Sequence, residues 1–214
     1  GISNVLTLPS CVDLTIAEKA DSSSKKVSLV PQGKLRIVFT GGVYVANEDA
    51  ILFFLKTIEK VKDIEVIFAT TTNRSYLENV SIGFVPKREC YELQRNADIL
   101  LLPLSFKCPY PEEIECAFPT KSLEYLAVGK PILAIVPKGT FIHDFVEKNN
   151  VGIVVTELSE QKILDAIKRL MDPENRKIFS ENAAKTILLY DARRQAKRLY
   201  DIIQNVISSF QSDE

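Results

Sequence analysis

One short stretch of the sequence places a lysine and a carboxylate in the first turns of a predicted helix. Residues 118–131 read Phe-Pro-Thr-Lys-Ser-Leu-Glu-Tyr-Leu-Ala-Val-Gly-Lys-Pro. Pro119 suits a helix start, where free backbone amides attract an anion. Lys121 opposes the helix dipole unless an anion is present, and Glu124 reaches the same edge. The spacing suits a phosphate beside a sugar, although a solvated Lys–Glu pair on a surface helix is the commoner explanation.

A second candidate segment follows the first predicted strand, where the chain reads Phe-Thr-Gly-Gly over residues 39–42. Gly41 and Gly42 let the backbone approach a phosphate closely. The full three-glycine dinucleotide fingerprint is absent, so a plain tight turn explains the pair equally well.

These residues have to be positioned by a series of short apolar runs that alternate with helical patterns. Strands that are apolar on both faces and alternate with helices predict an α/β fold, a Rossmann-like doubly wound parallel sheet with helices on both faces. Three consecutive helical patterns then form a helical C-terminal tail, with Ser159, Asp172 and Asp191 as caps. The predicted strands cover 35–40, 64–70, 99–104, 132–136 and 151–155.

The pattern divides the chain into three parts. Residues 1–34 include a polar, turn-rich stretch and form an interdomain segment and linker. Residues 35–190 form the Rossmann-like domain, and residues 191–214 form the last helix.

Composition excludes several classes of function. A net charge of -1 and the lack of a basic stripe argue against a nucleic-acid partner. The four cysteines, at 11, 90, 108 and 116, have no CxxC spacing, and His143 is the one histidine, so we expect no metal site. Thiols without a secretion signal favour a cytoplasmic protein.

The stretch 118–131 resembles the donor-site helix of GT-B glycosyltransferases, in particular the large retaining family called family four. Residues 5–13 are similar to that family's interdomain Pro-Asn-Gly-Val-Asp segment. Residues 39–49 resemble its first strand and loop in the C-terminal domain, and residues 80–103 its Gly-containing strand, helix and Ala-Asp-Ile strand. Residues 139–156 resemble its Glu-x-x-x-Gly region.

The resemblance implies a binding site for a nucleotide-diphosphate sugar. Glu124 would bind the ribose hydroxyls, and the amides around Thr120, together with Lys121, would hold the diphosphate. The loop at Gly41 and Gly42 would lie near the phosphates, and the backbone at Val85 and Pro86 would border the base.

The resemblance also implies a larger enzyme that transfers a sugar to a carbohydrate or lipid-linked acceptor without a bound metal or other cofactor. The catalytic base and the acceptor site would lie on a preceding N-terminal domain, onto which the last helix would pack. An acceptor in the membrane would make the protein peripherally membrane-associated.

The sequence departs from the family pattern at two places. Cys116 stands where the family often has a first glutamate, and residues 46–48 (Ala-Asn-Glu) replace its usual basic residues. Arg74 and Lys87 are the candidates to compensate. Two alternatives therefore stay open: a sugar-nucleotide epimerase of the same architecture, and a non-catalytic scaffold domain with a degenerate donor site.

Overall fold

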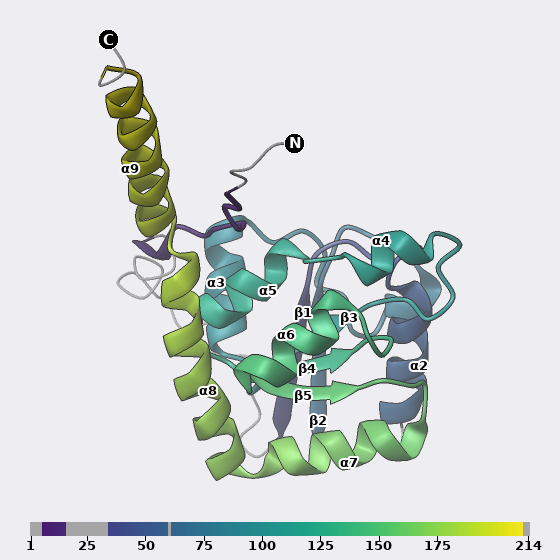
Figure 1. Ribbon diagram of the computed structural model, residues 1–214. Coiled ribbons are helices and arrows are strands. Elements are labelled where there is room, and N and C mark those ends of the chain that lie inside the picture. The colour runs from purple at the N-terminus through teal and green to yellow at the C-terminus, as the bar shows by residue number, and fades with distance from the viewer. Residues whose placement is uncertain (1–5, 16–33, 60, 212–214) are drawn as a thin grey trace.

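The protein is built around one parallel sheet of five strands. A computed structural model describes residues 6–15, 34–59 and 61–211 (Figure 1). The strand order is β2-β1-β3-β4-β5, and every neighbouring pair is parallel. The strands are β1 (Leu35–Thr40), β2 (Ile64–Ala69), β3 (Ile99–Pro103), β4 (Ile132–Ile135) and β5 (Gly152–Val155).

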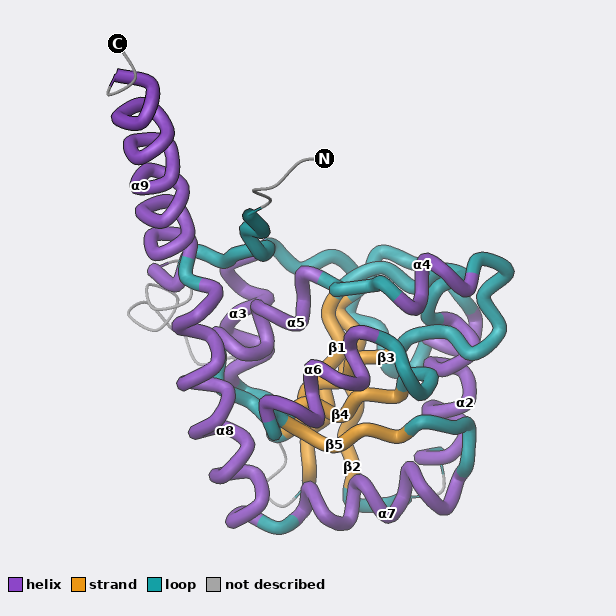
Figure 2. Tube along the Cα trace, viewed as in Figure 1, coloured by secondary structure: helices purple, strands orange, loops and turns teal. Residues whose placement is uncertain are grey.

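Helices cover both faces of this sheet, as the alternation of patterns predicted (Figure 2). One buried cluster joins the sheet to helices α2 and α7, and the other joins the opposite face to α3, α5, α6 and α8. The fold is therefore α/β, Rossmann-like and doubly wound. The helices are α2 (Glu48–Ile58), α3 (Lys87–Arg95), α4 (Pro111–Glu115), α5 (Thr120–Ala127), α6 (Phe141–Asn149), α7 (Glu160–Met171), α8 (Pro173–Ile187) and α9 (Ala192–Gln211), with short 3-10 turns η2 (Ser75–Leu77) and η3 (Leu188–Tyr190).

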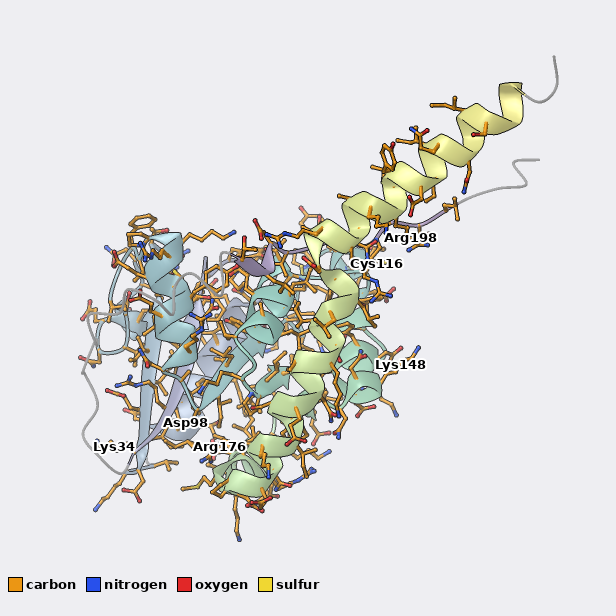
Figure 3. All side chains as sticks on the ribbon, turned by 90° about the vertical axis from the view of Figure 1, so that its left-hand side faces the viewer. Lys34, Asp98, Cys116, Lys148, Arg176 and Arg198 are labelled. Carbon is orange, nitrogen blue, oxygen red and sulfur yellow. The ribbon has the colours of Figure 1, made fainter. Side chains whose placement is uncertain are left out.

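The helical tail has two different parts. Helix α8 packs along α5 and α6, whereas α9 extends away from the domain (Figures 1 and 3). Before α9 the chain forms a bridge between Val12 and Asp191, with main-chain hydrogen bonds of 3.0 Å on either side. The segment that precedes the domain is thus fixed to the base of α9.

Most predicted elements are confirmed, with ends that differ by a residue or two. Ser159 and Asp172 cap α7 and α8 through their side chains, and Pro173 stands in the first turn of α8. The strand expected near Val80 is reduced to a single bridge between Phe68 and Ser81 beside β2. Residues 1–5 and 16–33 of the predicted interdomain segment and linker lie outside the described residues.

Two local features differ from what the sequence pattern indicates. The polar stretch with Glu112, Glu113 and Glu115 is typical of a solvated loop, but it forms the short helix α4, which begins at Pro111. Asn47 stands at the start of α2, but its side chain bonds Tyr44 N and Gly42 O and does not cap the helix. The asparagine therefore closes the glycine loop instead. Within the described ranges, no helix is long and apolar enough to cross a membrane.

Candidate functional site

The strand order reverses between β1 and β3, and this switch point locates the site. In open parallel sheets, ligands bind outside the carboxyl ends of the strands where the order reverses. Here β1 ends at Thr40 and runs into Gly41-Gly42, while the chain beyond β3 leads to α5. The two segments that the sequence singled out therefore meet at the position that this fold uses for ligands.

Lys121 and Gly41 are in direct contact. Gly41 has a φ of +127°, which disfavours any side chain there, and a Cβ added to it would lie 1.9 Å from Lys121 Cε. The ammonium also lies 5.7 Å from the centroid of the Phe39 ring. Burial lowers the pKa of Lys121, and the nearby Glu124 carboxylate opposes that shift. Among the described residues Lys121 has no ion pair, so its partly desolvated charge is available to an anion.

Glu124, one helical turn after Lys121, lines a cavity of about 320 Å³. Its side chain is 21% exposed, and its Oε1 lies 3.5 Å from the ammonium of Lys87, the first residue of α3. The cavity thus joins the starts of two helices, whose amides favour negative charge. Its lining consists of Ser10, Cys11, Val12, Asp13, Lys87, Tyr91, Thr120, Leu123 and Glu124.

Buried polar contacts hold the two helices at the switch point. The fully buried hydroxyl of Tyr125, in α5, accepts from Thr40 N and donates to Leu101 O, both at 3.3 Å. Gln94, in α3, donates to Thr40 Oγ1 at 2.8 Å. Thr40, at the end of β1, is therefore hydrogen-bonded to both helices of the site. These are α5, which carries Lys121 and Glu124, and α3, which carries Lys87.

The segment predicted to border a base stands between two hollows. Val85 is half-buried, Pro86 is exposed, and Val85 O accepts from the Cys90 thiol at 3.3 Å. On one side lies the Glu124 cavity. On the other lies a hollow of about 370 Å³ rimmed by Phe84, whose side chain is 75% exposed, and by the threonines that follow β2. An aromatic surface beside polar groups suits a nucleobase.

Sequence reasoning missed part of the Glu124 cavity. Asp13 and Tyr91 line it, although the interdomain segment was expected only to connect domains. Burial, with the charges of Glu124 and Asp13, raises the pKa of Tyr91 to about 12, so the phenol stays protonated and can donate a hydrogen bond. Placement of residues 10–13 beside α3 required the bridge to Asp191, which has no signal in the local sequence.

The structure separates the two cations that could replace the missing basic residues. Arg74 pairs with Glu48 at 3.2 Å and borders the hollow beside Phe84, whereas Lys87 lines the Glu124 cavity. Cys116, at the position of the family's first glutamate, is exposed just after α4.

A larger cavity, of about 670 Å³, lies along α2. Its walls are largely apolar and include Leu52, Phe53 and Leu158. It contains none of the predicted site residues. We place the candidate site at the switch point instead, because lysines, helix starts and a carboxylate meet there.

Comparison with solved structures identifies the same fold in larger enzymes. Sucrose-phosphate synthase from Thermosynechococcus elongatus matches with a TM-score of 0.68 and 13% identity over 94% of this chain and 52% of that chain. α,α-Trehalose-6-phosphate synthase from Burkholderia multivorans matches with a TM-score of 0.68 and 11% identity over 96% and 50%. This chain thus spans about half the length of these two proteins.

A third structure corresponds to a single domain. The C-terminal domain of a glycosyl transferase group 1 family protein (LpcC) from Francisella tularensis matches with a TM-score of 0.58 and 18% identity over 85% of this chain and 99% of that domain. No curated protein sequence matches significantly. The model of the family described as glycosyl transferases group 1 matches residues 34–173, which include the whole sheet, Lys87, Lys121 and Glu124. The chain therefore belongs to the glycosyl transferases group 1 family.

Proposed function

We propose that this chain is the C-terminal, donor-binding domain of a glycosyltransferase that uses a nucleotide-diphosphate sugar. The observation that carries the proposal is the contact of Lys121 with Gly41 at the β1–β3 switch point, with Glu124 one helical turn away. A desolvated cation and free helix amides suit a diphosphate, and a carboxylate beside them suits the two ribose hydroxyls.

The proposed reaction is transfer of the sugar to a carbohydrate or lipid-linked acceptor. As the glycosidic bond breaks, negative charge accumulates on the leaving diphosphate. Lys121 and the amides at Thr120 would stabilise that charge, so we propose that no bound metal is needed. The base side of the donor would lie along Val85 and Pro86, next to the exposed ring of Phe84.

The proposal includes an N-terminal acceptor domain that carries the catalytic base. The described residues 6–15 reach the base of α9, where Val12 bridges to Asp191. Helix α9 exposes an apolar stripe that such a domain would cover. The stripe consists of Leu199, Ile203, Val206 and Ile207, which are each 43–49% exposed.

A cytoplasmic location, with contact to a membrane only through a lipid-linked acceptor, completes the proposal. It is supported by the four cysteines, which are all free thiols.

Calorimetric titration of the 214-residue chain with UDP and GDP, in buffer containing EDTA, tests the donor site. We expect one nucleotide to bind, and Glu124→Ala to weaken it about tenfold or more, because a charge-assisted contact to the ribose is lost. The control is Glu89→Ala: Glu89 lies in the first turn of α3 but does not line the cavity. A folded chain that binds neither nucleotide would contradict the proposal.

A non-catalytic scaffold is the second candidate. It is favoured by the exposed Cys116 and by the pairing of Arg74 with Glu48, which leave fewer charges for a donor. Full-length protein in which Glu124→Ala leaves sugar transfer intact would support the scaffold. Product formed from the sugar nucleotide without any acceptor would point to an epimerase.

A further inference from the structure

Two solvent-exposed cations lie near the carboxyl edge of the sheet, each paired with a carboxylate. Arg74 Nε is 3.2 Å from Glu48 Oε1, and Lys87 Nζ is 3.5 Å from Glu124 Oε1. Their side chains are 52% and 67% exposed. Each is close enough to the site to be considered as a ligand for the donor, so their surroundings have to decide between them.

Arg74 belongs to a contact that stabilises the fold. Its partner Glu48 also accepts a hydrogen bond of 2.7 Å from the Tyr76 hydroxyl. These two contacts, that of Tyr76 first, lower the pKa of Glu48. Glu48 lies in the first turn of α2, where a carboxylate is favoured by the helix dipole. The carboxylate is therefore held by its own structural partners, and Arg74 is neutralised outside the Glu124 cavity.

Lys87 is in the opposite situation. It is the first residue of α3, where the helix dipole disfavours a cation. Its partner is Glu124, the carboxylate that the proposed function assigns to the ribose. The only other charged residue among those that line this cavity is Asp13, which has contacts of its own. A ribose that takes the oxygens of Glu124 would therefore compete with Lys87.

We propose that Lys87 makes this site select nucleoside diphosphates over nucleosides. Without a nucleotide, the ammonium neutralises Glu124. When the ribose hydroxyls hydrogen-bond to Glu124, the long and exposed Lys87 side chain swings to a phosphate oxygen of the same ligand. A nucleoside has no phosphate to offer in exchange, so it has to break the pair without compensation. The inference rests on the proposed function, because it takes Glu124 as the ribose ligand.

The proposed exchange predicts that Lys87→Met changes the affinity for nucleotides and for nucleosides in different directions. Lys87→Met keeps the length of the side chain and removes the charge. We expect it to weaken binding of UDP or GDP about tenfold, since a charge-assisted contact to phosphate is lost. Binding of uridine or guanosine should stay the same or become tighter, because Glu124 is no longer occupied.

The test is titration of the wild-type chain, Lys87→Met and Arg74→Met with UDP, GDP, uridine and guanosine, using calorimetry for the nucleotides and ligand-observed NMR for the nucleosides. Arg74→Met tests the other cation. It should leave the difference in affinity between nucleotide and nucleoside unchanged, because the hollow that Arg74 borders is proposed to lie beside the base, which both classes of ligand carry. Thermal unfolding of each variant verifies that the exposed substitutions leave the fold intact.

Three results would overturn the inference. Lys87→Met could weaken nucleoside and nucleotide equally, which would mean that Lys87 only orients Glu124. It could leave nucleotide binding unchanged, or Arg74→Met could cause the loss instead. In all three cases the wild-type chain still binds a nucleotide, so the proposed function survives. A wild-type chain that binds no nucleotide would remove the proposed function and this inference together.

Discussion

The two edges of the sheet each hold a desolvated cation, Arg36 or Lys121, in different surroundings. At the amino edge, Arg36 is 2% exposed and its Nε lies 2.6 Å from Glu65 Oε2 on the neighbouring strand. Its main-chain amide donates to Asp98 Oδ2 at 2.8 Å. The labels Asp98 and Lys34 in Figure 3 mark this end of the sheet. At the carboxyl edge, Lys121 is partly desolvated with no ion pair among the described residues, and it contacts Gly41 and the Phe39 ring.

The difference indicates which edge is built for a ligand. A desolvated charge that has an internal partner contributes to the fold, whereas one that lacks a partner is favourable only when an anion arrives. Substitutions at the amino edge should therefore change stability without changing donor binding. A substitution that displaces Lys121 at the carboxyl edge should change donor binding.

The largest expected effect is at the amino edge. Arg36→Met removes the partner of Glu65 and should lower the free energy of unfolding by about 3 kcal/mol, the lower end for breaking a buried pair, because Glu65 is 25% exposed. Urea denaturation measures the loss. The affinity of the folded fraction for UDP or GDP should equal that of the wild-type chain. A large loss of affinity in folded Arg36→Met protein would erase the distinction between the edges.

A smaller effect on stability, joined to an effect on binding, is expected at Gly41. An alanine at a φ of +127° is strained by about 1–3 kcal/mol, and its Cβ takes the space of the Lys121 ammonium. The lysine tip is flexible, so it moves away and leaves the phosphate position. We expect Gly41→Ala to unfold at lower urea concentration and to bind UDP or GDP about tenfold more weakly.

Gly139→Ala is the matched control for this substitution. Gly139 also has a positive φ, +81°, but a Cβ there would meet no atom within 4 Å. The control should lose stability and keep its affinity. Equal losses of affinity in the two variants would mean that Lys121 has no specific dependence on Gly41.

The sequence predicted most of this fold because the strands are buried on both faces. Runs such as Ile99–Pro103 are continuously apolar, and their alternation with helical patterns fixes a doubly wound sheet. Gly129 followed by Pro131 is a typical sequence signal for a helix end, and Gly129 stands just after α5 with a φ of +66°. The strand expected near Val80 is shorter than predicted. Its main-chain hydrogen bonds to β2, from Phe68 N to Val80 O and from Ile82 N to Phe68 O, involve a single residue of β2.

The candidate site was predictable only in part, and for a physical reason. The residues around Lys121 and Glu124 are close in sequence, so helical spacing alone brings them together. The contact of Lys121 with Gly41 and that of Lys87 with Glu124 join residues 80 and 37 positions apart. Such contacts follow from the packing of α3 and α5 on the sheet, which no local pattern encodes. Whether these residues bind a nucleotide stays a prediction.

The smallest expected effect is at Tyr125. This residue tests whether the contacts that hold α5 in place are distinct from the contacts that bind the ligand. Tyr125→Phe removes a buried hydroxyl that bonds Thr40 N and Leu101 O, and should lower the free energy of unfolding by about 1–2 kcal/mol. Packing of the ring still holds α5, so the affinity for UDP or GDP should stay within about twofold. Tyr200→Phe, on the exposed side of α9, is the control and should change neither quantity. If Tyr125→Phe protein keeps its stability but loses its affinity, the Tyr125 hydroxyl acts on the ligand. The binding site would then include Tyr125 as well as Lys121 and Glu124.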